Sequence, residues 1–114
     1  MSGFELYGEI CETKRLLDLA LSEAKSRGYA MNVAEAEYYT AKDMRVRELM
    51  DDGMSGTAIS MVIKGEHPVN DAMRNYHDRK VEYANAIEAI RIYNRWFDFL
   101  REQYQREWRQ AGEQ

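Results

Sequence analysis

The chain has 114 residues, with 16 Lys and Arg against 20 Asp and Glu, a net charge of −4, and one cysteine. This length fits one domain, and the acidic balance argues against nonspecific binding to nucleic acid or to a membrane surface. Cys11 cannot form an internal disulfide, and no segment has the composition of a signal peptide or a membrane span, so we expect a cytoplasmic protein.

The first predicted element is a long helix over residues 5–51. Its apolar residues are mostly small and recur at helical spacing: Ile10, Leu17, Ala20, Ala24, Met31, Ala34, Tyr38, Ala41 and Leu49. Small side chains on one helix let a second helix with large side chains approach closely. Gly28 interrupts this helix at a cost of about 1 kcal/mol relative to alanine. It is either tolerated in a continuous helix, or a kink, or a place where a partner's Tyr or Trp packs on bare backbone.

Residues 52–68 form a connector with readable capping signals. Gly53 follows the last periodic residues, as expected for a helix C-cap, and Ser55 or Thr57 can cap a short new helix. That helix carries four apolar residues: Ile59, Met61, Val62 and Ile63. Gly65 is expected to end it, and a left-handed conformation there would make glycine necessary. The apolar residues either close the end of the fold or stay exposed for a partner.

The second long helix is predicted over residues 69–110. A heptad seam runs along it at alternating steps of three and four: Val69, Ala72, Tyr76, Arg79, Tyr83, Ala86, Ile90, Tyr93, Phe97, Leu100 and Tyr104. Further apolar residues stand on neighbouring faces: Ile87, Ala89, Ile92, Trp96 and Phe99. One facing helix cannot cover so wide an apolar face, which favours a bundle over a lone hairpin.

Together these elements predict an all-α fold, a coiled-coil-like antiparallel helical hairpin with a short helix at its tip. At about 1.5 Å per residue each long helix would measure roughly 60 to 70 Å. We expect residues 1–114 to form a single domain. Because two helices enclose little interior, we also expect a partner, first of all a second copy that makes a dimer.

No catalytic, cofactor or metal-binding pattern is recognisable in the sequence. His67 and His77 lack the spaced His, Cys or carboxylate partners that a metal site needs. Cys11 is flanked by Glu9 and Glu12 rather than by groups that lower a thiol pKa. No glycine-rich phosphate loop or nucleophile elbow occurs. We therefore expect a protein that is not an enzyme and has no cofactor or metal.

The run from Arg47 to Arg74 has the order of elements of a helix-turn-helix. Its second helix, however, would open on acidic and apolar residues that offer phosphates no cation. Over residues 40–80 seven basic side chains are balanced by seven acidic ones. Sequence-specific DNA binding is therefore disfavoured, although a nucleic-acid-binding or replication accessory role stays the alternative.

Aromatic residues gather where both ends of the chain are expected to meet. Trp, Tyr and Arg are the residue types that most often anchor protein interfaces. The candidate interaction residues at this end are Tyr93, Arg95, Trp96, Phe99 and Trp108, and at the tip they are Met61 and Ile63. A role in protein binding or self-association follows from the exposed apolar surface that they would form.

Three features together resemble small helical accessory proteins of phages and prophages of Gram-positive bacteria. They are the helix end Arg47-Glu48-Leu49-Met50-Asp51-Asp52-Gly53-Met54, the turn Ala58-Ile59-Ser60-Met61-Val62-Ile63-Lys64-Gly65, and the tryptophan-bearing tail. The resemblance spans most of the chain and implies no catalytic residues. It implies a protein that works in the cytoplasm of a host cell and binds a host or phage protein. One such role is the inhibition of a host defence system, in the manner of anti-CRISPR proteins.

Overall fold

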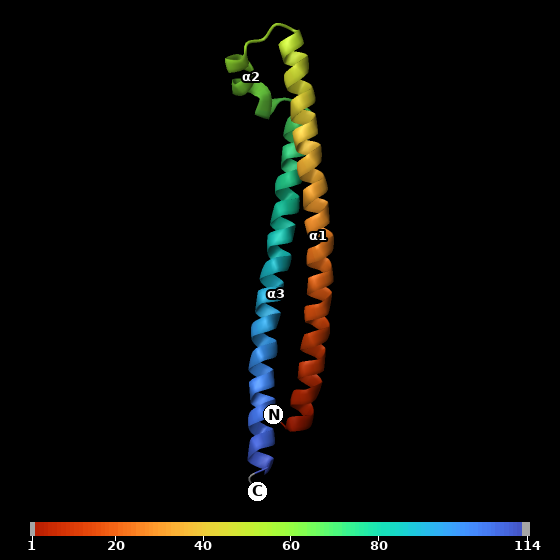
Figure 1. The fold of residues 1–114 in the computed structure, drawn as a ribbon, viewed down its shortest axis with the longest axis vertical. Helices are drawn as coiled ribbons and strands as arrows, with labels where there is room; N and C mark the ends of the chain where they lie inside the picture. The colour runs from red at the N-terminus through yellow and green to blue at the C-terminus, as the bar shows by residue number, and fades with distance from the viewer. Residues whose placement is uncertain (1, 113–114) are drawn as a thin grey trace. The chain divides into compact units, whose positions relative to one another are not determined.

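The structure is a computed structural model that describes residues 2–112. It contains the helices α1 (Gly3–Asp51), α2 (Gly56–Val62) and α3 (Val69–Gly112), and a 3₁₀ turn η1 (Ile63–Gly65) follows α2. Residues 2–112 contain no strand. The all-α antiparallel hairpin with a short helix between its two long helices is confirmed, and the predicted bounds of the long helices differ by at most two residues (Figure 1).

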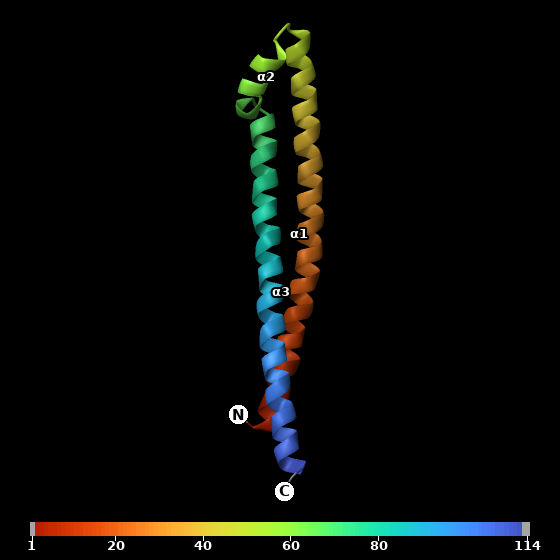
Figure 2. The ribbon, with the colours of Figure 1, turned by 60° about the vertical axis from the view of Figure 1, so that its left-hand side comes forward.

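The chain divides into two compact units, and α1 and α3 run through both. The terminal unit comprises Met1–Lys25 and Ala84–Gln114, and the tip unit comprises Ser26–Tyr83. In the terminal unit the first part of α1 and the last part of α3 run in opposite directions, so that the start of α1 and the end of α3 lie at the same end of this unit (Figure 1). In the tip unit α2 lies beside the last turns of α1 and next to the start of α3 (Figure 2).

The predicted seams form the helix contacts inside each unit. All seam residues predicted on the two long helices are buried or half-buried. In the terminal unit the rings of Tyr7 and Tyr104 lie 6.2 Å apart, and in the tip unit Tyr83 packs against Gly28. Gly28 lies 21 residues after Tyr7, and Tyr83 lies 21 residues before Tyr104. Both units therefore pair the helices in the same heptad register, because 21 residues are three heptads.

Four further residues complete the α1 seam at positions that the apolar pattern did not predict. Leu6 and Thr13 are buried, and Arg27 and Arg45 are half-buried. Together with the predicted residues they continue the alternating steps of four and three from Leu6 to Arg45, and a further step of four leads to Leu49. An arginine can occupy such a position because its methylene stem packs while its guanidinium reaches polar groups at the edge.

The core of the tip unit joins all the helical elements of that unit. It consists of Tyr38, Leu49, Ile59, Ile63 and Val69. Ile63 is only 4% exposed, whereas Met61 on the outer side of α2 is 82% exposed. The prediction that Ile63 belongs to an exposed interaction surface is therefore wrong, because this residue closes the end of the helix pair.

Polar contacts hold the connector against the long helices. Gly53 has a φ of +90°, and the amides of Gly53 and Met54 donate to the carbonyls of Met50 and Leu49, which is a Schellman motif. Ser55 caps α2 by accepting a hydrogen bond of 3.2 Å from the amide of Ala58. The amide group of Asn70 in α3 donates to the carbonyl of Lys64 at 3.0 Å. The predicted C-cap at Gly53 and the cap at Ser55 are confirmed.

Gly65 does not have the left-handed conformation that we considered for it. Gly53 alone among the described glycines has a positive φ, and a Cβ at either Gly53 or Gly65 would meet no atom within 4 Å. We therefore expect Gly53→Ala to lower the free energy of unfolding by about 1 to 2 kcal/mol, because an L residue is strained there. Gly65→Ala should cause no loss. Urea denaturation of both variants measures the difference, and equal stabilities would contradict this account of the turn.

Gly28 lies inside a continuous α1, and the Tyr83 ring packs against its backbone. A Cβ on Gly28 would lie 3.1 Å from Cε2 of Tyr83, whereas a Cβ on Gly8 would meet nothing within 4 Å. The continuous helix is thus confirmed, and the ring on the Gly28 backbone comes from the chain itself rather than from a partner.

This contrast predicts opposite outcomes for two glycines of one helix. Gly8→Ala should raise the free energy of unfolding by about 1 kcal/mol, because alanine is the better helix former. Gly28→Ala should raise the free energy of unfolding by a smaller amount. Gly28→Leu should lower the free energy of unfolding by about 1 to 3 kcal/mol, because the leucine side chain displaces the Tyr83 ring. Thermal and urea unfolding provide the measurement. A stabilised Gly28→Leu variant would show that the Tyr83 contact does not matter.

Candidate interaction surfaces

The terminal unit carries an apolar patch on α3 that lies outside the seam. It consists of Ile92, Trp96 and Phe99, which we call the flank patch. Their spacing of four and three residues places them on one side of the helix. The Trp96 and Phe99 rings are stacked, with centroids 5.4 Å apart and planes 18° apart, yet the residues stay 45% and 49% exposed. The single chain therefore leaves the flank patch largely uncovered.

Arg95 lies beside the flank patch, four residues before Phe99, and is exposed. No acidic side chain in residues 2–112 forms an ion pair with it, whereas Arg91 pairs with Glu88 and Arg101 pairs with Asp98. An arginine without an ion pair to any described residue, next to two stacked rings, has the composition of an interface anchor.

A second aromatic cluster of the terminal unit joins the two helices. Tyr104 contacts Tyr7 at 6.2 Å and Trp108 at 6.1 Å between ring centroids. With Gly3 and Phe4 these residues line a cavity of about 420 Å³, which we call the terminal hollow. The aromatic residues expected at this end therefore form two separate clusters.

A hydrogen bond with Cys11 raises the pKa of the Tyr7 phenol above its ordinary value.

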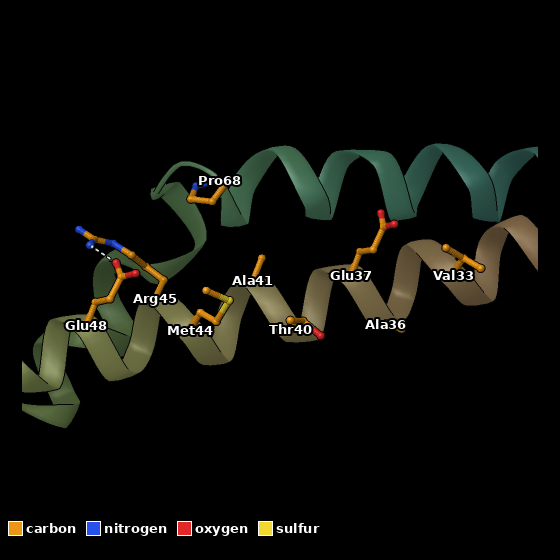
Figure 3. Close-up of a pocket in the computed structure, with 9 residues that line it drawn as sticks. All are labelled: Val33, Ala36, Glu37, Thr40, Ala41, Met44, Arg45, Glu48 and Pro68. Atoms are coloured by element: carbon orange, nitrogen blue, oxygen red, sulfur yellow. Dashed lines mark hydrogen bonds and ion pairs between the residues drawn. The ribbon is translucent and has the colours of Figure 1, made fainter.

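A third surface is a groove of about 480 Å³ in the tip unit. Its floor is formed by small or flexible α1 side chains, among them Val33, Ala36 and Met44, and Pro68 faces them from the start of α3 (Figure 3). On its border Arg45 pairs with Glu48 at 2.9 Å and with Glu66 at 3.2 Å. The groove can take up apolar groups, but the charge of its arginine is already matched.

Polar side chains cross the seam of the tip unit at three places. Arg27 donates to the carbonyl of Glu82 at 3.1 Å, and the Tyr76 hydroxyl donates to Glu35 at 2.7 Å. The third is the ion pair of Arg45 with Glu66. The bond to Glu35 raises the pKa of the Tyr76 phenol, since it favours the protonated form. These contacts select the register of the two helices, because a slip would separate the partners.

In residues 2–112 no three His, Cys, Asp or Glu side chains converge in a way that could hold a metal ion. Within the same part of the chain, none of the helices combines the length and apolar character needed to cross a membrane.

Comparison of the chain with known protein families, with curated proteins and with solved structures finds no match.

The structure separates the predicted interaction residues into distinct places. Trp96, Phe99 and Arg95 share the flank patch or its edge, and Trp108 lines the terminal hollow. Tyr93 is half-buried in the seam rather than on the patch, and Met61 is exposed on α2, away from the terminal unit's patch. The sequence analysis named Ile92 among the apolar residues outside the seam but not among the interaction residues, although its place four residues before Trp96 was a usable signal.

The bond between Tyr76 and Glu35 predicts a pH-dependent contribution to stability. The pKa of Tyr76 is raised above its ordinary value of 10.0, so the folded chain holds this proton more tightly than the unfolded chain does. The stabilisation is therefore complete below pH 10 and is lost as the pH rises through the folded-state pKa. Tyr76→Phe should lower the unfolding midpoint at pH 7, and its deficit should shrink above about pH 10.

Tyr29→Phe is the matched control, because Tyr29 is exposed in the same unit. Its midpoint should follow that of the unaltered chain at every pH. A Tyr76→Phe deficit that stays constant up to pH 11.5, well above the ordinary tyrosine pKa of about 10, would contradict the assignment.

Proposed function

We propose that this protein is a non-enzymatic protein-interaction module and that the flank patch is its principal binding surface. The observation that carries the proposal is the stacked pair Trp96 and Phe99, which stays about half exposed beside an arginine that forms no ion pair within residues 2–112. Stacked aromatic rings fixed on a helix lose little conformational entropy on binding, and they offer a large apolar area.

A second copy of the chain is the partner that the patch suits best. Two identical patches related by a two-fold axis bury each other, and they convert two hairpins into a four-helix bundle. The area supplied by three side chains is less than the roughly 800 Å² per partner of a standard interface. The flank patch would therefore be the centre of the interface, and the neighbouring polar residues of α3 its rim.

More specifically, we propose that the protein is a phage-encoded inhibitor of a host defence system that acts by stoichiometric binding in the host cytoplasm. Support for this form comes from the resemblance of the sequence, and the flank patch supplies a surface through which it could act. The nucleic-acid-binding alternative has the less favourable charge distribution, since the basic and acidic side chains of residues 40–80 are equal in number.

Replacing Trp96 by Glu should dissociate the assembly. We expect sedimentation of the unaltered chain at high micromolar concentration to give twice the chain mass of 13.4 kDa. Trp96→Glu should raise the dimer dissociation constant by at least about tenfold, because it buries an unpaired charge. Asn94→Glu adds the same charge at an exposed position two residues away and should leave the dimer intact.

Circular dichroism should show that both variants keep their helices, which separates dissociation from unfolding. A monomer at every concentration of the unaltered chain would refute self-association. Equal weakening by Asn94→Glu and Trp96→Glu would show that added charge acts generally and that the flank patch has no special role.

A further inference from the structure

The terminal hollow exposes more aromatic surface than a core requires. Phe4 is 91% exposed, and Tyr7 and Trp108 are also exposed, whereas Tyr104 between them is half-buried. The Tyr104 and Trp108 rings meet edge to face at 74°, so their faces point in different directions. Aromatic faces carry a negative partial charge and attract cations that come within about 6 Å. A hollow with several such walls favours a positively charged group.

A carboxylate that forms no ion pair or hydrogen bond within residues 2–112 stands at the edge of the same hollow. A smaller cavity of about 260 Å³ adjoins the terminal hollow, shares Gly3 and Trp108 with it, and is also lined by Glu107. A Cβ on Gly3 would lie 3.2 Å from Oε2 of Glu107, so this oxygen rests close to the bare backbone at the start of α1. The carboxylate is thus held beside the aromatic walls.

Four other acidic residues of the terminal unit have hydrogen-bond or ion-pair partners, whereas no such partner of Glu107 occurs among residues 2–112. Glu12, Glu88 and Asp98 each pair with an arginine three residues further along the helix. Glu5 forms a capping box with Ser2, since each accepts a hydrogen bond of 3.2 Å from the backbone amide of the other. The helical neighbours of Glu107 are Gln103, Tyr104, Gln110 and Ala111, and none of these is a cation. Within residues 2–112 nothing neutralises Glu107.

We propose that the terminal hollow is a receptor for an arginine side chain of a partner protein. The planar guanidinium stacks on aromatic faces and can donate two parallel hydrogen bonds to one carboxylate. Glu107 and the Trp108 and Tyr7 rings offer these two kinds of contact in one place. A quaternary ammonium group would use the rings but has no N–H for Glu107, and a lysine ammonium is more strongly hydrated and stacks less well.

This site is distinct from the flank patch. It rests on the proposed function only in that the natural source of the arginine is a protein. Binding of a free arginine derivative requires neither self-association nor Trp96. The two proposals can therefore fail separately.

The experiment titrates N-acetyl-L-arginine methylamide into the full chain carrying Trp96→Phe, which leaves Trp108 as the one tryptophan of the two in the sequence. We expect a saturable change in Trp108 emission with a dissociation constant on the order of millimolar, as for a single charged contact of a few kcal/mol. The citrulline analogue has nearly the same shape but no charge, and it should bind at least about tenfold more weakly. The lysine analogue should also bind more weakly.

Two variants in the same background test the carboxylate. Glu107→Gln should weaken arginine binding by about tenfold, whereas Glu102→Gln, at an exposed position of the same helix, should leave it unchanged. Equal binding of the arginine and citrulline compounds, an emission change that does not saturate, or equal effects of the two variants would overturn the proposal. A Trp108 signal that depends on protein concentration without any added compound, and that persists when Trp96→Glu replaces Trp96→Phe, would assign the hollow to a second copy and would overturn the partner assignment.

Discussion

The close approach of α1 and α3 at Gly28 is the constraint on which the packing of the tip unit depends. The Tyr83 ring fits there because the opposite residue has no side chain. A slip of one heptad would place Leu21 or Glu35 opposite this ring, and either side chain would collide with it. The same slip would separate Tyr76 from Glu35 and Arg45 from Glu66, leaving polar groups of the seam unpaired. One missing side chain and a few polar contacts thus select a single alignment among several that the apolar pattern would allow.

The long helices could be predicted because their signal is local. Steps of three and four between apolar residues fix the seam of α3 from Val69 to Tyr104 and most of the seam of α1. Three of the four remaining α1 positions, Thr13, Arg27 and Arg45, were missed because they are polar and no pattern of hydrophobicity marks them, whereas the apolar Leu6 could have been predicted. Their burial depends on what the opposite helix offers, such as the carbonyl of Glu82 for Arg27.

The tip and the terminal hollow were less predictable for a different physical reason. Met61 and Ile63 are equally apolar neighbours, and only the direction in which α2 meets α1 decides that one is exposed and the other buried. Gly53 and Gly65 likewise occupy similar places after a helix, yet only Gly53 needs a positive φ. The terminal hollow combines residues about a hundred positions apart. Its existence follows from the heptad register, which fixes Tyr7 opposite Tyr104.

The positions of the two tryptophans confine tryptophan fluorescence to one of the two units. Both Trp96 and Trp108 belong to the terminal unit, whereas the tip unit contains tyrosines and no tryptophan. Tryptophan emission therefore reports on one unit alone, while far-ultraviolet circular dichroism reports on the helices of both. Transitions that coincide by the two signals would show that melting spreads along α1 and α3 as one cooperative event. Transitions that separate would show that a continuous helix can fray in one unit while its other part stays folded.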